Sequence, residues 1–237
     1  MLKIVNFSKS YKSSKKAVDN LNLEVKAGDI YGFIGHNGAG KSTTLKAVAG
    51  VLDFEEGDIF IDGYSVKAEP ILCKQKIAFI PDNPDIYEHL TGLQYLNFIS
   101  DIFGVDKGIR KTLIIKYADI FEITKNLGDI ISSYSHGMKQ KLALISALIH
   151  KPKLMIMDEP FVGLDPKAAH SIKEIMKDLC NQGSAILFST HVLEVAEKIC
   201  NKIAIIKNGK LVVSGDTKDV VKNSNLEDVF LELYAHE

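Results

Sequence analysis

The residues best suited to chemistry in this sequence form one glycine-rich segment that ends in a lysine and two hydroxyl residues. In order they are Gly35, His36, Asn37, Gly38, Ala39, Gly40, Lys41, Ser42 and Thr43. Glycines let backbone N–H groups turn inward around the phosphate oxygens of a ligand. A lysine at this spacing bridges the β- and γ-phosphates of a nucleotide, and the next hydroxyl ligates magnesium. We therefore predict that this segment binds a nucleotide, with Lys41 and Ser42 in these roles.

The residues on either side fit a phosphate-binding loop. The apolar run 30–34 predicts a strand that leads into the loop, and 44–51 predicts a helix that leads out of it. The positive end of such a helix favours a bound anion. A glycine-rich turn beside a helix is the plainer interpretation, but chance produces this pattern in only about one chain in a hundred of this length.

A second polar group follows an apolar strand predicted over 154–157. Asp158 and Glu159 stand at the carboxyl end of that strand, where α/β proteins bind their ligands. We predict that Asp158 holds magnesium and that Glu159 orients and polarises the attacking water. Acidic residues are common at solvated strand ends, so the pair alone would say little. It is informative here because a phosphate-binding segment precedes it.

The remaining patterns predict an α/β fold in a single domain, 1–237. Apolar strands alternating with helices indicate a mostly parallel sheet with helices on its faces. With the phosphate-binding segment, we expect this sheet to form a P-loop NTPase core, and we expect an antiparallel β region at the N-terminus. Helical spacing dominates the middle of the chain and predicts an inserted α-helical subdomain. The predicted boundaries are 1–86 and 149–237 for the nucleotide-binding α/β core and 87–148 for the helical subdomain.

Composition limits the classes of partner. Lys and Arg number 29 against 30 Asp and Glu, so the net charge of −1 gives no basic field for nucleic acid, and no nucleic-acid partner is expected. Three scattered cysteines indicate a reduced, cytoplasmic protein. No apolar run reaches the length of a membrane span, so we expect any membrane role to come through a partner.

Several further motifs resemble those of the ATP-binding subunit of an ABC transporter, over nearly the whole chain. The segment 134–138 resembles the signature motif, and it places Ser135 and Gly137 at a helix start that can meet an anion. Segment 163–165, ending in Asp165, resembles the D-loop. His191 resembles the switch histidine that donates to the γ-phosphate, and Tyr11 resembles the aromatic residue that stacks on adenine.

The resemblance implies a full set of site residues, with ATP and Mg²⁺ as cofactors. The implied catalytic residues are Lys41, Glu159 and His191. Nucleotide binding is implied for Tyr11, Gly35, Asn37, Gly38, Ala39, Gly40, Lys41, Ser42, Thr43, Ser135, Gly137 and Asp165. Metal binding is implied for Ser42, Asp158 and Asp82.

The resemblance also implies partners. A second copy or a homologous ATPase subunit would dock head to tail, so that ATP lies between the Lys41 loop of one subunit and the 135–137 segment of the other. An integral membrane permease subunit would hold the protein on the cytoplasmic face of the membrane. We expect segment 82–96 to form that dock, with Ile86 and Leu90 in contact with the permease.

The chain departs from the family pattern in two places. Asp82 stands where the family usually has glutamine, and His136 and Met138 replace the glycine and glutamine of the signature. This combination is similar to a subgroup of bacterial ABC ATPases paired with export-type membrane subunits, which predicts export. Two alternatives remain at this stage: a soluble ABC-type ATPase without a transporter, for example in metallocluster assembly, and a regulatory module with impaired catalysis.

Overall fold

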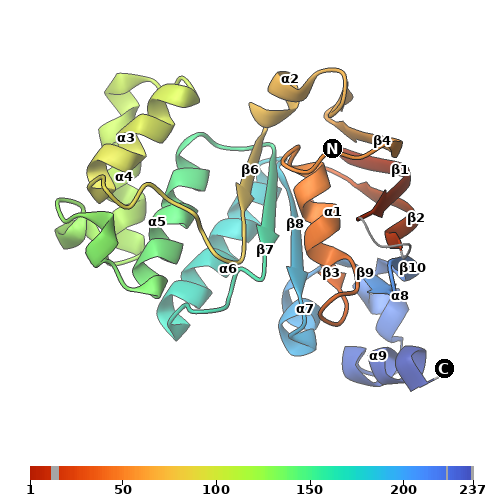
Figure 1. Ribbon diagram of the computed structural model, residues 1–237. Coiled ribbons are helices and arrows are strands. Elements are labelled where there is room, and N and C mark those ends of the chain that lie inside the picture. The colour runs from red at the N-terminus through yellow and green to blue at the C-terminus, as the bar shows by residue number, and fades with distance from the viewer. Residues whose placement is uncertain (12–15, 223, 236–237) are drawn as a thin grey trace.

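The computed structural model describes residues 1–11, 16–222 and 224–235 (Figure 1). Its strands are β1 Leu2–Ser10, β2 Lys16–Val25, β3 Ile30–Ile34, β4 Glu56–Ile61, β5 Tyr64–Ser65, β6 Ile77–Ile80, β7 Leu154–Asp158, β8 Ala185–Thr190, β9 Lys202–Lys207 and β10 Lys210–Asp216. Its α-helices are α1 Lys41–Val48, α2 Pro70–Lys74, α3 Gly92–Ile102, α4 Lys107–Ile120, α5 His136–Ile149, α6 Pro166–Asn181, α7 Leu193–Ile199, α8 Thr217–Val221 and α9 Leu226–Ala235.

A six-stranded sheet in the order β10-β9-β3-β8-β7-β6 forms the centre of the molecule. All neighbouring strands in it are parallel except β10, which pairs antiparallel with β9. This arrangement confirms the predicted mostly parallel sheet. Because parallel strands end at one edge, the residues after β3, β6, β7 and β8 meet at the same edge of the sheet.

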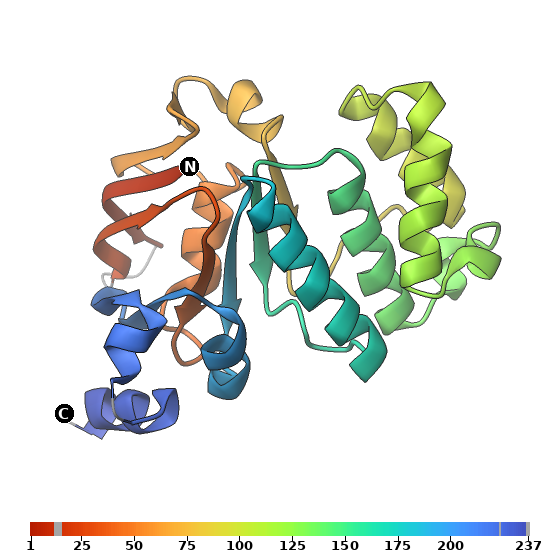
Figure 2. The same ribbon diagram turned by 180° about the vertical axis from the view of Figure 1, so that it is seen from behind.

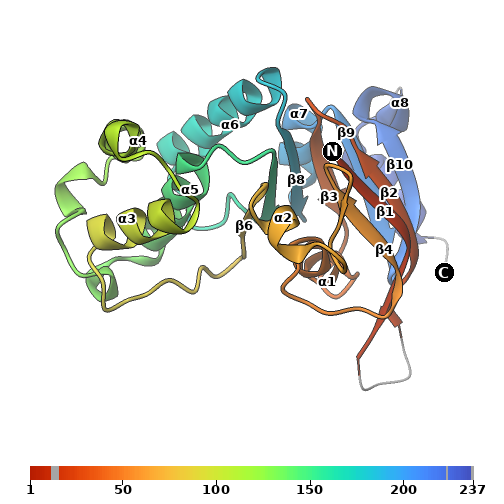
Figure 3. The same ribbon diagram turned by 90° about the horizontal axis from the view of Figure 1, so that it is seen from above.

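The first strands form a separate antiparallel sheet in the order β2-β1-β4-β5, which confirms the predicted N-terminal antiparallel region. Its apolar residues share a core with α1 and with one face of the six-stranded sheet. Figure 3 shows this sheet curving past α1 on the side away from the helices α3 to α6. The helix that follows the phosphate loop is therefore enclosed between two sheets.

Strand β3 shows why the sheet is central. All five of its residues are buried, as expected of a strand covered on both faces. Ile30 and Ile34 belong to the core shared with the helical side, whereas Tyr31 and Phe33 belong to the core shared with α1. The period of two in a strand thus divides its side chains between two cores.

The chain between β6 and β7 contains α3, α4 and α5, which lie to one side of the sheet (Figures 2 and 3). Helix α3 begins with a capping box, in which the Thr91 hydroxyl accepts from the Gln94 backbone N–H and the Gln94 side chain accepts from the Thr91 N–H. Helices α3 and α5 pack against each other and carry buried apolar residues of one continuous core.

Some element boundaries differ from the sequence prediction. Helix α1 begins at Lys41 and ends at Val48, whereas the apolar spacing predicted 44–51. The short helices α2 and α8 were not predicted, because five residues are too few for a helical period to emerge. Within the described ranges, no helix is both long enough and apolar enough to span a membrane.

Candidate functional site

The loop between β3 and α1 depends on glycine. A Cβ on Gly35 would lie 2.5 Å from the carbonyl oxygen of Ile206, and one on Gly40 would lie 2.5 Å from that of Ala17. Gly40 precedes α1 with a φ of 108°, and Gly38 has a φ of 82°, both in the left-handed region that favours glycine. The glycines fix a tight backbone path directly before the N-terminus of α1, where backbone N–H groups lack helical partners and can meet an anion.

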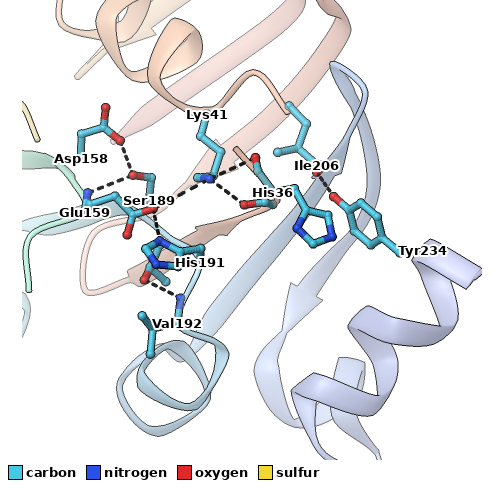
Figure 4. A network of polar contacts seen from close by, with 11 residues as sticks. His36, Lys41, Asp158, Glu159, Ser189, His191, Val192, Ile206 and Tyr234 are labelled. Atoms are coloured by element: carbon cyan, nitrogen blue, oxygen red, sulfur yellow. Dashed lines mark hydrogen bonds and ion pairs between the residues drawn. The ribbon is translucent and has the colours of Figure 1, made fainter. Parts of the chain in front are cut away.

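Lys41, the first residue of α1, provides a buried cation in this loop. Its side chain is only 6% exposed, and its Nζ donates to the carbonyl oxygens of Gly35 at 2.6 Å and His36 at 3.3 Å (Figure 4). The same Nζ lies 3.9 Å from Oε1 of Glu159. Burial lowers the pKa of Lys41, and the nearby charges of Glu159 and Asp158 oppose that shift. The loop thus holds an ammonium group beside a helix N-terminus, where a phosphate chain would find two favourable fields.

Strand β7 carries Asp158 to the same edge. The side chain is 3% exposed, and the Ser189 hydroxyl of the adjacent strand β8 donates to its Oδ1. Ser189 stands opposite Asp158 in the parallel register, and its Oγ also accepts from the Glu159 backbone N–H at 3.1 Å. Ser189 therefore fixes both acids. The sequence interpretation did not assign it a role, although a serine following the apolar run 185–188 was a usable signal.

Glu159 lies in a strained backbone conformation, with a φ of 50° in a residue that is not glycine. Such conformations persist where the surrounding structure holds them, and they cluster at functional sites. Its Oε1 lies 2.9 Å from Nδ1 of His191, which follows β8. Figure 4 shows Lys41, Glu159 and His191 directed toward one another. A carboxylate, a buried cation and an imidazole therefore meet at one point of the sheet edge.

Lys41, Asp158 and Glu159 line a cavity of about 210 Å³, and His191 lies outside its lining. Its lining consists of Ala17, His36, Asn37, Gly38, Gly40, Lys41, Ser42, Thr43, Asp82, Asp158 and Glu159. Tyr11 stands beside this lining, with its hydroxyl 3.3 Å from Oγ1 of Thr43. Ala39 is buried in the core, and its backbone oxygen accepts from Gly209 at 2.9 Å, so it supports the loop from behind.

The donor set of this cavity fits a nucleotide with magnesium. The buried ammonium of Lys41 and the N-terminus of α1 suit phosphate oxygens. The hydroxyl of Ser42 and the carboxylates of Asp158 and Asp82 are the hard oxygen donors that Mg²⁺ prefers. Magnesium usually takes one or two carboxylates together with substrate phosphates, and this cavity offers that combination.

Two other predicted nucleotide residues, Ser135 and Gly137, lie outside the cavity lining. Ser135 is exposed and caps α5, with its hydroxyl accepting from the Met138 N–H at 3.3 Å. A Cβ on Gly137 would lie 2.9 Å from the Gly163 carbonyl oxygen. The start of α5 therefore packs closely against the loop before α6, and Gly137 allows that approach.

Asp165 also lies outside the cavity lining. It caps α6 by accepting from the Ala168 N–H at 2.8 Å, and it pairs with Nζ of Lys141 on α5 at 2.6 Å. This pairing with Lys141 holds the pKa of Asp165 below its usual value. We call the two helix starts, with Ser135, Gly137 and Asp165, the α5–α6 surface.

Known proteins resemble this chain in both sequence and fold. The model of the ABC transporter family matches residues 18–162, and a model described as AAA domain, putative AbiEii toxin, Type IV TA system, matches residues 130–197. The Linearmycin resistance ATP-binding protein LnrL of Bacillus subtilis (strain 168) is 34% identical over 220 residues, which are 93% of this chain and 70% of that protein.

Two further similarities extend over most of both chains. The ABC-type transporter ATP-binding protein EcsA of Bacillus subtilis (strain 168) is 33% identical over 219 residues, which are 90% of this chain and 89% of that protein. A solved structure described as the ATP binding subunit of an ABC transporter superposes with a TM-score of 0.94 at 31% identity, over 99% of each chain.

Proposed function

This chain belongs to the ABC transporter family as an ATP-binding subunit that hydrolyses ATP for transport, and we propose which of its residues perform each step. The observation that carries the proposal is the meeting of Lys41, Glu159 and His191 at the edge of the sheet, beside the glycine loop. Lys41 and Glu159, with side chains 6% and 13% exposed, partly satisfy each other's charge, because buried charges require partners.

Phosphate binding is assigned to the loop and to Lys41. The Nζ of Lys41 exchanges its contacts with the Gly35 and His36 carbonyl oxygens for contacts with β- and γ-phosphate oxygens. Backbone N–H groups at the start of α1 complete the cradle, together with Asn37, Gly38, Gly40 and Thr43. Tyr11, placed beside Thr43, is assigned to the adenine ring.

Hydrolysis is assigned to Glu159 and His191. The Glu159 carboxylate accepts the proton of a water molecule whose oxygen attacks the γ-phosphorus, and the bond to the bridging oxygen of ADP breaks. His191 holds Glu159 in place through the 2.9 Å contact and donates to the departing phosphate. The strained backbone of Glu159 aims the carboxylate before the substrate arrives.

Magnesium is assigned to Ser42 and Asp158, with Asp82 as a third oxygen donor from the loop after β6. When bound, the ion would neutralise charge on the transferred phosphate. The Ser189 hydroxyl keeps the Asp158 carboxylate oriented toward the cavity. The acid at position 82 distinguishes this chain from the family pattern with glutamine.

The α5–α6 surface is assigned to the nucleotide of a second subunit, either a second copy or a homologous chain. Its residues stand outside this chain's own cavity, and Ser135 is exposed at a helix start. ATP between two subunits would favour the closed dimer, and a shift from 1:99 to 99:1 requires about 5.5 kcal/mol of differential binding. Two nucleotides with charge-assisted contacts fit that requirement.

A membrane permease is the proposed partner of segment 82–96 and the adjoining groove. A cavity of about 330 Å³ meets this segment at Tyr95, and its other lining residues, mainly apolar and including Phe79 and Phe103, lie outside 82–96. Tyr87 and Leu93 are exposed in the same segment and are better contacts than Ile86, which is 7% exposed and part of the core. A charge at Ile86 would test folding rather than docking, so Tyr87→Glu and Leu93→Glu are the variants to use.

The proposed direction of transport is outward, and the proposed location of this subunit is the cytoplasmic face of the membrane. The Pro-Asp pair after β6 and the altered signature support the export-type subgroup. The similarity to a protein named for linearmycin resistance supports outward transport too, because outward transport would serve resistance.

The docking proposal has its own test. If Tyr87→Glu and Leu93→Glu leave transport unchanged, the permease does not dock on this segment.

The catalytic assignment is tested by Glu159→Gln, with Glu174→Gln on the exposed face of α6 as the matched control. We expect the Glu159 variant to lose about a hundredfold or more of its ATP turnover while it still binds ATP, since a general base contributes about 10² to 10⁴. The control should keep its turnover. Normal hydrolysis by Glu159→Gln would show that another group activates the water.

A further inference from the structure

His36 of the phosphate loop contacts the last helix of the chain. Helix α9, nearly 200 residues further along the chain, presents two aromatic rings to His36. The His36 ring centroid lies 4.9 Å from that of Phe230 and 4.3 Å from that of Tyr234, at interplanar angles of 69° and 84°. Phe230 and Tyr234 stack on each other with centroids 4.4 Å apart. Edge-to-face and stacked geometries of this kind are favourable aromatic contacts.

Tyr234 is itself anchored to the sheet. Its hydroxyl donates to the carbonyl oxygen of Ile206 in β9 at 2.9 Å, as Figure 4 shows. The adjacent Lys207 donates from Nζ to the Leu233 carbonyl oxygen at 3.2 Å, and its Nζ lies 5.1 Å from the centre of the Tyr234 ring. The Ile206 carbonyl is also the group that a Cβ on Gly35 would strike. Helix α9 is therefore fixed at the strand end that borders the loop.

His36 connects α9 to the phosphate-binding lysine. Its ring contacts α9, while its carbonyl oxygen accepts from Nζ of Lys41 at 3.3 Å. The neighbouring Gly35 carbonyl accepts from the same Nζ at 2.6 Å. Residues 35 and 36 are thus bonded to Lys41 through their carbonyl oxygens, while the His36 ring contacts α9 and the Ile206 carbonyl of β9 lies close to Gly35.

We propose that His36, Phe230 and Tyr234 are positioning residues for ATP, through which α9 orients the phosphate loop and Lys41 before the nucleotide binds. The proposal rests on the assignment of Lys41 to the phosphates. Preorganisation of a binding loop lowers the entropy lost on binding, so its effect falls on affinity rather than on the chemical step. Because coupling between two sites is reciprocal, ATP in the loop must also stabilise the docked α9.

The first test compares Tyr234→Ala with Leu231→Ala, which changes an exposed side chain on the same helix. We expect Tyr234→Ala to raise the KM for ATP by about twofold to tenfold, the range that an aromatic pair supports. The kcat at saturating ATP should stay within about twofold of the original, and Leu231→Ala should change neither constant. Tyr234→Phe keeps the ring and loses only the hydrogen bond to Ile206. Its KM for ATP should therefore lie between that of the original chain and that of Tyr234→Ala.

A double-mutant cycle separates positioning from a loss of general stability. His36→Ala and Tyr234→Ala should raise KM by similar factors, and the double variant should be no worse than the poorer single variant. His36→Phe keeps an aromatic ring at this position, so it should retain most of the ATP affinity that His36→Ala loses. If the two single substitutions raised KM by factors that multiply in the double variant, the proposal would be overturned. A lowered kcat with an unchanged KM in the single variants would overturn it too.

Hydrogen exchange supplies a readout that a purely structural contact would not move. We expect the backbone amides of 226–235 to exchange more slowly when ATP is added, and we expect this slowing to disappear in His36→Ala. Unchanged exchange in the original chain at saturating ATP would overturn the proposal. Loss of turnover in the original chain would instead contradict the proposed function, so the two failures are distinguishable.

Discussion

The cavity at the edge of the sheet and the α5–α6 surface differ in how far each is prepared within one chain. The cavity encloses Lys41 and Asp158, whose side chains are 6% and 3% exposed, and each of these two groups has a hydrogen-bond partner within the chain. The α5–α6 surface presents Ser135 to solvent, with its hydroxyl bonded only to its own helix. The first region is a cavity that already contains paired buried charges, whereas the second is an exposed surface.

The difference follows from the cost of burial. A buried ammonium or carboxylate needs hydrogen bonds and opposite charges around it, so the chain must supply them itself. An exposed helix start can leave its N–H groups to water until an anion arrives. A composite site made from both regions can therefore assemble and separate without leaving a charge stranded in either state.

The largest effect is expected from Lys41→Ala, which removes the buried cation from the cavity. ATP turnover should fall by about a hundredfold or more, as for the loss of one preorganised electrostatic contact in a transition state. Lys46→Ala, on the exposed face of the same helix, is the matched control and should keep its turnover. Steady-state hydrolysis and equilibrium ATP binding measure both variants. If Lys41→Ala binds and hydrolyses ATP normally, the cavity is not the site.

Ser135→Glu should reduce turnover by about tenfold to a hundredfold. The added carboxylate would face phosphate across the proposed interface, and like charges placed together cost several kcal/mol. The comparison variant is Ser132→Glu, an exposed position just before α5 that we place outside the interface. Equal ATP turnover in the two variants would show that the α5–α6 surface does not contact the nucleotide.

Ser189→Ala tests whether the cavity is held together by its own partners. The Asp158 carboxylate would lose a buried donor, so the free energy of unfolding should fall by about 1–3 kcal/mol. Ser100→Ala provides the control, because this equally buried serine donates to a helical carbonyl oxygen that water or backbone can otherwise satisfy. Urea denaturation measures both, and an equal loss in the two would remove the special role of Ser189.

The smallest effect is expected from Lys141→Ala in the α5–α6 surface. Lys141 lowers the pKa of Asp165 from its usual value of 3.8, so the pair stabilises the fold above that value and loses its contribution as pH falls through the lowered pKa. Asp165 is half exposed, so the pair should contribute about 0.2–1 kcal/mol at neutral pH. Melting temperatures should differ at pH 7, and the difference should shrink as the pH falls below 3.8. A difference that persists in acid would place the effect outside the ion pair.

The sequence predicted those parts of the site that are contiguous. The phosphate loop, the pair Asp158 and Glu159, and His191 each carry their own local signal, because a strand, a turn and a helix start fix their positions. The sheet edge then brings them together, since parallel strands end side by side. The two sheets and the helical region were likewise predictable from the apolar periods.

Contacts between distant segments were not predictable. Ser189 and Asp158 are 31 residues apart and meet only through the register of two strands. The contact of His36 with Tyr234 depends on where the last helix packs, and the pairing of Lys141 with Asp165 depends on the approach of two helix starts. No local propensity encodes these distances, because tertiary packing sets them.

The most direct test of the account is the mass of Glu159→Gln in solution, measured by light scattering with and without ATP. We expect one chain of 26.2 kDa without nucleotide and twice that mass with saturating ATP and magnesium. Adding Ser135→Glu to this variant should restore the mass of one chain while ATP still binds at the cavity. A Glu159→Gln protein that binds ATP and stays at the mass of one chain would contradict a composite site built from two copies of this chain.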